Sequence, residues 1–361
     1  MVGRYERNSP VVLILAIIIL ISAIGLRKQQ MPDIEEPTNI KFDSETKTIY
    51  LDSLTLKQKI AQMIIGYGDE VNKEVMRKMF IGGIYFDPEP TRDGFVKAIN
   101  NFQRWQIVPL FIAADMEGCW NPFDNFQKFP AFKDIETKEQ AYEAGFQEGE
   151  LMKELGFNIN FAPVLDLEDK IWKCRSFSGN PEEIAEKANM YIDGLRANGI
   201  IATAKHYPGK TLVGDDPHRF VAFSKIEEED MLPFESAIKN NVSAIMISHK
   251  IVTGFMDSES KPSVVSEKLV KGLRGKFSGL IITDEIRMGG LKKYYSDINK
   301  MYVDLFRADN DIILDFDRDP SNIYKMISVV EDAINRGEIS EGRIDRSIER
   351  IFTAKGISIT K

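Results

Sequence analysis

The fold is decided by a stretch in the first third of the chain, IGGIYFDPEPTRDGFVKAINNFQRWQIVPLFIAAD, residues 81–115. Two short apolar runs, 81–87 and 109–115, enclose a helical stretch. A strand, a crossover helix and a second strand make up the unit from which parallel sheets are built. The stretch therefore predicts two parallel strands joined by a helix.

The same pattern repeats along the chain from residue 53 onward. Six further strand-like runs cover residues 62–68, 159–166, 200–208, 243–250, 279–285 and 310–316. Thr55 with Gln58, and Thr137 with Gln140, have the spacing of capping boxes that begin helices. Eight strands with helical connections over roughly 300 residues predict a single-domain α/β fold, a (β/α)8 barrel of the TIM type. An open doubly wound sheet is disfavoured because it has fewer strands and a glycine-rich first turn, and no GxGxxG or GxxxxGK[ST] motif is present.

Length, composition and charge exclude several classes of protein. The 361 residues fit one large domain with a tail, and 43% hydrophobic with 28% charged residues exclude wholesale disorder. The formal net charge of −8, without a basic stripe, argues against nucleic acid as the main partner.

An unbroken apolar run, VVLILAIIILISAIGL, occupies residues 11–26 with basic residues at both ends. As a helix it is about 24 Å long, between a signal-peptide core and a full membrane span. We expect a signal anchor over residues 1–28, with a cleaved signal peptide left open by the small residues near its end. Residues 29–50 are predicted as a polar stalk and residues 51–361 as the barrel. The expected location is the cell membrane, single-pass, with the catalytic domain outside the cytoplasm, or secretion if the segment is cleaved.

Polar residues gather where the predicted strands end. Because barrel enzymes build their active sites at the carboxyl ends of the strands, these residues predict a catalytic barrel. They are Asp115, Asp166, Lys205, His206, His249 and Asp284.

The motifs present and absent limit the kinds of catalysis expected of this barrel. No HxH, HExxH or cysteine cluster is present, so neither a metal site nor a cofactor is expected. No GxSxG motif marks a serine nucleophile. A carboxylate nucleophile with a separate proton donor remains, as in retaining glycoside hydrolysis.

Residues 205–218, KHYPGKTLVGDDPH, resemble the KH[FY]PG…DxH signature of glycoside hydrolase family 3, in its single-barrel β-N-acetylhexosaminidase branch. Other segments agree in order, among them ADMEG, FAPVLD with RSF, IITDEIRMGGL and RIDRSIERIFTAK. The resemblance covers about residues 53 to 355.

The resemblance implies a role for each matching residue. Asp284 matches the catalytic nucleophile, His218 the general acid/base and Asp216 the residue that orients it. Substrate-binding roles fall to Asp115, Arg175, Lys205 and His206. His249 matches a position with a structural role. The implied activity is removal of terminal β-N-acetylglucosamine from a carbohydrate substrate through a covalent glycosyl-aspartate.

The chain departs from the family in two loops. The family continues its EGG motif with an arginine-bearing stretch, whereas this chain reads Cys119-Trp120-Asn121-Pro122-Phe123. The family's PGHG is here Pro208-Gly209-Lys210-Thr211. The missing arginine puts specificity for the leaving group in doubt. A β-glucosidase, a glycosyl phosphorylase and a non-catalytic sugar-binding relative therefore stay open as alternatives.

The positions of the two cysteines bear on whether they form a disulfide. Cys119 follows the third predicted strand and Cys174 lies in the loop after the fourth, so both lie on the catalytic face of adjacent units. In an exported domain we expect them to form a disulfide, the alternative being two thiols too far apart to bridge.

Overall fold

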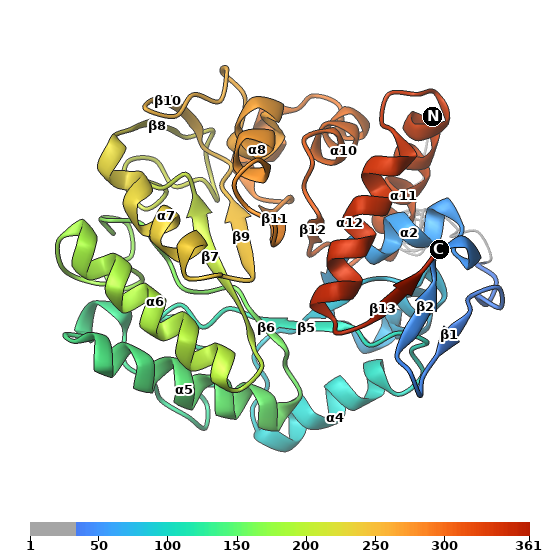
Figure 1. Cartoon of the computed structure of the whole chain (residues 1–361), viewed down its shortest axis with the longest axis horizontal. Coiled ribbons are helices and arrows are strands. Elements are labelled where there is room, and N and C mark those ends of the chain that lie inside the picture. The colour runs from blue at the N-terminus through green and yellow to red at the C-terminus, as the bar shows by residue number, and fades with distance from the viewer. Residues whose placement is uncertain (1–33) are drawn as a thin grey trace, which may run out of the picture. The chain divides into compact units, whose positions relative to one another are not determined.

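The computed structural model describes residues 34–361, of which residues 36–361 form one compact unit. Eight parallel strands close into a barrel in the order β11-β12-β3-β4-β5-β6-β7-β9, so each strand neighbours the next along the chain (Figure 1). All eight predicted runs form barrel strands, and the (β/α)8 prediction is confirmed. The strands are β3 (Ile64–Tyr67), β4 (Gly83–Tyr85), β5 (Phe111–Ala114), β6 (Ile159–Asn160), β7 (Ile201–Tyr207), β9 (Ala244–Ile247), β11 (Leu280–Glu285) and β12 (Ile312–Asp315).

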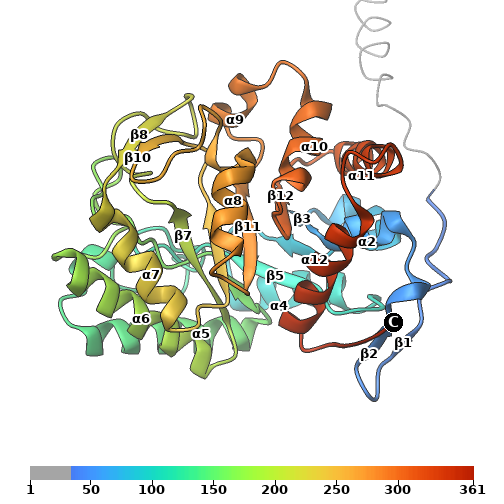
Figure 2. The same ribbon diagram turned by 45° about the horizontal axis from the view of Figure 1, so that its top comes forward.

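Helices surround the barrel and bury its outer surface (Figures 1 and 2). Strands β3, β5, β9 and β12 are buried along their whole length, as expected for a parallel sheet covered on both faces. The helices are α2 (Leu56–Gln62), α3 (Lys73–Met79), α4 (Arg92–Gln103), α5 (Lys138–Leu155), α6 (Pro181–Ala197), α7 (Leu232–Lys239), α8 (Glu267–Arg274), α9 (Gly289–Tyr294), α10 (Ile298–Arg307), α11 (Pro320–Asn335) and α12 (Glu341–Ala354).

Both predicted helix starts are confirmed. Thr55 precedes α2, and its side chain accepts a hydrogen bond from the Gln58 amide while the Gln58 side chain accepts one from the Thr55 amide. Thr137 and Gln140 make the same reciprocal pair at the start of α5. Such pairs satisfy amides that the first helical turn leaves without partners.

The structure differs from the expected stalk at residues 42–50. β1 (Phe42–Asp43) and β2 (Thr48–Tyr50) form a hairpin that pairs with β13 (Ser358–Thr360), the last strand of the chain. The C-terminus lies beside this hairpin in Figures 1 and 2. Ile49 of β2 is fully buried and lies opposite Ile359. The segment reads as polar because only one of its residues, Ile49, supplies the buried contact. Its partner Ile359 lies 310 positions away in the chain (359 − 49).

A second small sheet lies among the loops that follow β7 and β9. β8 (Phe223–Ile226) pairs in parallel with β10 (Ile251–Gly254). This pair ties the loop after β7, which carries Asp216 and His218, to the loop after β9. Both loops leave the carboxyl ends of barrel strands, the expected location of the site.

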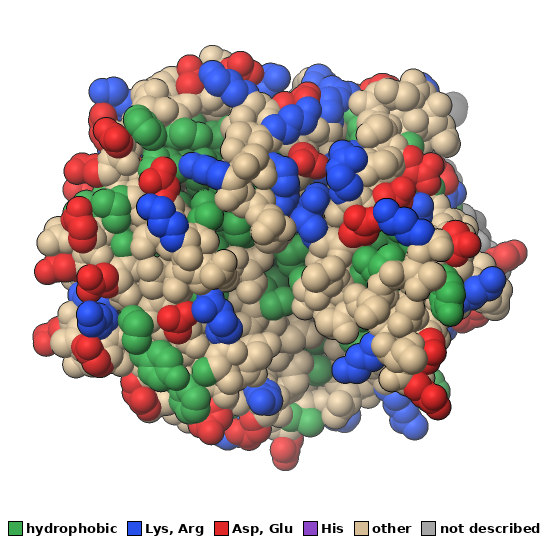
Figure 3. Space-filling view, in the orientation of Figure 1, with side chains coloured by type: hydrophobic (Ala, Val, Ile, Leu, Met, Phe, Trp, Pro, Cys, Tyr) green, Lys and Arg blue, Asp and Glu red, His purple; other side chains and the backbone are tan. Residues whose placement is uncertain are grey.

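The predicted anchor at residues 1–28, with its apolar run at residues 11–26, lies outside the described residues. Within residues 34–361, none of the helices has the length and apolar character needed to cross a membrane. The face drawn in Figure 3 carries acidic and basic side chains interspersed, with smaller hydrophobic patches between them.

Candidate active site

A cavity of about 660 Å³ opens at the carboxyl ends of the barrel strands. Its lining includes all seven residues to which the family resemblance assigned a catalytic or substrate-binding role, brought together from five loops and strands. They are Asp115, Arg175, Lys205, His206, Asp216, His218 and Asp284. The structure thus places them at one site, while their roles stay predictions.

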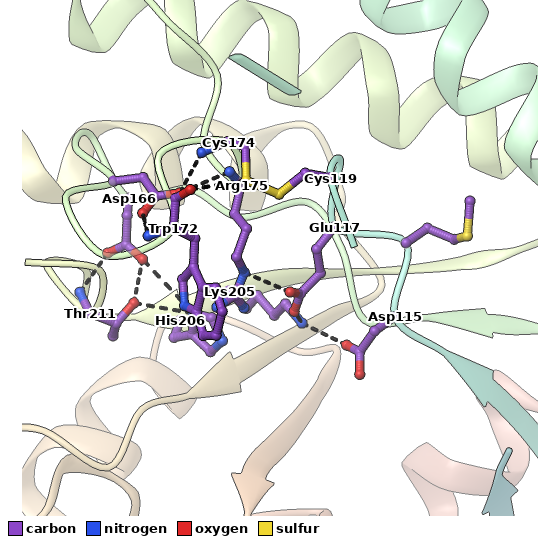
Figure 4. Close-up of polar contacts among 12 residues, drawn as sticks. Asp115, Glu117, Cys119, Asp166, Trp172, Cys174, Arg175, Lys205, His206 and Thr211 are labelled. Atoms are coloured by element: carbon purple, nitrogen blue, oxygen red, sulfur yellow. Dashed lines mark hydrogen bonds and ion pairs between the residues drawn. A yellow bond between two sulfur atoms is a disulfide. The ribbon is translucent and has the colours of Figure 1, made fainter. Parts of the chain in front are cut away.

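Four charged side chains form a connected group on one wall of the cavity. Lys205 Nζ in β7 lies 2.7 Å from Asp115 Oδ1, and it also contacts Glu117. Arg175 Nε lies 2.6 Å from Glu117 Oε2. Figure 4 shows Lys205 and Arg175 both reaching Glu117. Lys205 thus joins Asp115 to Glu117, and Arg175 pairs with the same Glu117.

The charges of this group are set by burial and by one another. Burial favours the neutral acid, yet Lys205 and Arg175 hold the pKa of Glu117 well below its usual range. Burial also raises the pKa of Asp115, and the Lys205 ammonium acts against that rise. Because a buried cation without its anion is costly, the four side chains hold one another in place before substrate arrives.

His206, also in β7, is oriented from behind. Its Nδ1 lies 3.2 Å from Thr211 Oγ1 and 3.8 Å from Asp166 Oδ2. Asp166 is buried and accepts a hydrogen bond of 2.8 Å from the Thr211 amide. Asp166 is absent from the cavity lining, which corrects its expected place among the residues at the mouth: it holds the loop that contacts His206.

Asp284, near the end of β11, is half-buried and lines the cavity. Burial alone would raise the pKa of its carboxyl. The nearby His206 and His218 rings act against that effect, and the Glu285 amide donates to Asp284 Oδ1 at 2.8 Å, so the pKa lies below its ordinary value. The carboxyl is therefore ionised at neutral pH, as a nucleophile requires.

His218 and Asp216 form a pair on the loop after β7. His218 Nδ1 lies 2.7 Å from Asp216 Oδ1, which also accepts from the His218 amide at 2.9 Å. Although burial opposes it, this contact holds the pKa of Asp216 below its ordinary value. The ionised carboxylate fixes the proton on Nδ1 and leaves Nε2 for proton transfer.

His249 is buried, and its Nε2 donates to the Glu285 carbonyl oxygen at 2.8 Å. It is absent from the cavity lining. Burial lowers its pKa, so the ring is held neutral next to Asp284. Its contact supports the backbone that carries Asp284.

Several residues that line the cavity were not predicted from the sequence. Glu117 could have been found, because in extended chain it lies two positions from Asp115 and so on the same side. Glu285 also lines the cavity, and burial raises the pKa of its carboxyl to about 7. Its position next to Asp284 in the sequence does not predict that contact. The aromatic lining had no sequence signal and comprises Tyr85, Trp120, Phe161, Trp172 and Phe316.

Cys119 and Cys174 form a disulfide with their Cα atoms 5.7 Å apart, which confirms that prediction (Figure 4). The bond joins the turn after β5 to the loop after β6. The Asp169 carboxylate orders this second loop, accepting from the amides of Trp172, Cys174 and Arg175 at 2.8, 2.9 and 2.8 Å. The loop that carries Arg175 is therefore held in place both by the disulfide and by the hydrogen bonds of its backbone amides to Asp169.

No group of three or more histidine, cysteine, aspartate or glutamate side chains is arranged to hold a metal ion within residues 34–361.

Comparison with known families gives a match over residues 55–354 to the family described as "Glycosyl hydrolase family 3 N terminal domain". A protein named beta-hexosaminidase from Tolumonas auensis is 32% identical over 246 residues, covering 62% of this chain and 72% of that protein. The beta-hexosaminidase LpqI of Mycobacterium bovis is 24% identical over 330 residues, covering 84% of this chain and 83% of its own.

Comparison with solved structures also gives family 3 proteins. A family 3 β-N-acetylglucosaminidase from a Paenibacillus species superposes with a TM-score of 0.78 at 28% identity, covering 84% of this chain and 62% of that one. This chain thus spans less than two thirds of the Paenibacillus protein. LpqI of Mycobacterium tuberculosis superposes with a TM-score of 0.77 at 23% identity, covering 85% of this chain and 95% of that one, which supports the fold.

Proposed function

The chain belongs to glycoside hydrolase family 3 and is a glycosidase, and from that premise we propose that it removes terminal β-N-acetylglucosamine residues with retention of configuration. The observation that carries the proposal is the cavity that holds an ionised Asp284 together with the paired His218 and Asp216. The names of the relatives support the choice of sugar.

The proposed reaction has two steps. In the first, the Asp284 carboxylate attacks the anomeric carbon, the glycosidic bond breaks, and the leaving oxygen takes the proton of His218 Nε2. In the second, a water molecule attacks the same carbon and releases Asp284, while its proton passes to His218. Two inversions give net retention.

Electrostatics explains why a histidine, and not a second carboxyl group, suits the role of proton donor here. Retaining glycosidases commonly use two carboxyl groups, which repel each other when both are ionised. Here the proton donor is cationic before transfer and neutral after it, so it does not raise the pKa of Asp284. Asp216 orients the His218 ring through its contact with Nδ1.

The wall formed by Lys205, Arg175, Asp115 and Glu117 is proposed to bind the hydroxyl groups of the sugar. Fixed donors and acceptors recognise a pyranose at little cost in reorganisation. Since the rejection of a wrong sugar depends on unpaired polar groups, this wall is where a glucoside and an N-acetylglucosaminide would be discriminated.

The test is a panel of nitrophenyl β-glycosides, with and without phosphate, with the first-formed anomer followed by proton NMR. We expect the N-acetylglucosaminide to be the best substrate and its β-anomer to form first. An α-anomer as the first product contradicts the covalent intermediate, a faster glucoside contradicts the sugar assignment, and sugar 1-phosphate in the phosphate arm identifies a phosphorylase.

We also propose that the barrel lies outside the cytoplasm, carried there by residues 1–28. The Cys119–Cys174 disulfide supports this location because such bonds persist in oxidising compartments. Cell fractionation combined with N-terminal sequencing tests it. Activity in the membrane fraction with an intact N-terminus supports the anchor, a truncated soluble form supports cleavage, and cytoplasmic activity overturns the proposal.

A further inference from the structure

Two tryptophans stand at the mouth of the active-site cavity without a role in the reaction described above. Trp120 and Trp172 line the cavity, with 54% and 48% of their surfaces exposed. Large exposed aromatic side chains on a concave surface indicate a binding site, since water is a poor partner for an indole face.

Trp172 is placed by its neighbours on the leaving-group side. Its ring meets the His218 ring edge to face, with centroids 6.3 Å apart and an interplanar angle of 85°. His218 is the proposed donor to the glycosidic oxygen, and whatever is attached to that oxygen lies next to the donor. The indole of Trp172 therefore borders the position of the leaving group.

The loops that carry Trp172 and Trp120 are held in place by contacts within the protein, without a ligand. The Trp172 amide donates to Asp169 at 2.8 Å, and the Arg175 guanidinium lies 6.0 Å from the centre of the Trp172 ring. The disulfide joins the residue before Trp120 to the second residue after Trp172. Gly118 permits the close approach of the two loops: its φ is +67°, and an added Cβ would lie 3.1 Å from the Cys174 carbonyl oxygen and 2.5 Å from the Phe132 amide nitrogen.

From this arrangement, and resting on the proposed function, we propose that Trp172 and Trp120 form a leaving-group subsite for a second pyranose ring. A pyranose presents C–H groups on its faces and hydroxyl groups around its rim, so it can stack on an indole while its rim stays solvated. The natural substrate is then an oligosaccharide, whose second sugar is recognised by shape and stacking.

The test compares two substrates that both need protonation of the leaving oxygen. One is the β-linked disaccharide of N-acetylglucosamine, and the other is its methyl β-glycoside, whose leaving group has no ring. Trp172→Ala should lower kcat/KM for the disaccharide about tenfold, the size of one lost aromatic contact, mainly through a higher KM. The methyl glycoside should change less than twofold.

Trp105 provides a matched control, because it is 60% exposed and is not part of the cavity lining. Trp105→Ala should leave both substrates unchanged. Trp172→Phe keeps a stacking ring and should recover most of the loss.

The outcomes separate the two proposals. Equal losses on both substrates would show that Trp172 only positions His218, and no loss on the disaccharide would show that nothing stacks there; either overturns the subsite. A wild-type protein that cleaves neither substrate, nor the nitrophenyl glycosides, overturns the proposed function instead.

Discussion

Glu148 in α5 gives a prediction whose size follows from its surroundings. The side chain is 1% exposed, and burial raises the pKa of its carboxyl to about 8. The Tyr191 hydroxyl in α6 donates to Glu148 and accepts from Asn160 Nδ2 at 3.1 Å. Asn160 Oδ1 in turn accepts from the Met116 amide at 3.0 Å, so this chain of contacts ends beside Glu117 in the active site.

The sign of the pH effect follows from proton binding. Between pH 4.5, the ordinary value for glutamate, and pH 8, the folded protein keeps the proton that the unfolded chain loses. The free energy of unfolding therefore falls as pH rises, by about 1.4 kcal/mol per pH unit from this one group. From pH 4.5 to pH 7 the loss amounts to about 3 kcal/mol.

Glu148→Gln removes this titration and keeps an oxygen that accepts from Tyr191. We expect the advantage of the variant over wild type to grow by about 3 kcal/mol from pH 4.5 to pH 7, measured by urea unfolding at several pH values. Glu150→Gln, an exposed change in the same helix, should show no such slope. A difference between Glu148→Gln and wild type that is independent of pH would refute the reasoning.

Four further predictions concern the site. Asp284→Ala should lower kcat by more than about a thousandfold with an unchanged circular dichroism spectrum, as for loss of a nucleophile, and near wild-type turnover would disprove its role. His218→Ala should slow the methyl glycoside far more than a nitrophenyl glycoside, since an activated leaving group needs little protonation; equal losses in kcat/KM would argue against the acid role. Activity should survive prolonged EDTA treatment, because residues 34–361 contain no ligand set for a metal; loss that zinc restores would contradict this. Cys119 and Cys174 should resist alkylation in the denatured, unreduced protein by intact-mass measurement, and two labelled thiols would exclude the disulfide.

The sequence alone determined the barrel and part of the set of polar residues at the carboxyl ends of its strands. The eight strands were predictable because a parallel sheet buried on both faces needs continuous apolar runs, and such runs are visible in one dimension. Asp115, Lys205 and Asp284 were predictable for a related reason: each falls at the end of a run, and all strand ends of a parallel barrel meet at one face.

Tertiary structure decided what depends on distance through space. The pairing of β2 with β13 joins segments at opposite ends of the chain, and a polar sequence with one buried isoleucine carries no sign of it. Asp166 and Asp115 look alike in sequence, yet one is buried behind His206 and the other lines the cavity. The wall of Trp120 and Trp172 exists because two loops meet across a disulfide, and their distance depends on the closure of the barrel as a whole. Periodicity in a chain reports which side chains are buried; which of them face one another is set by the packing of elements far apart in sequence.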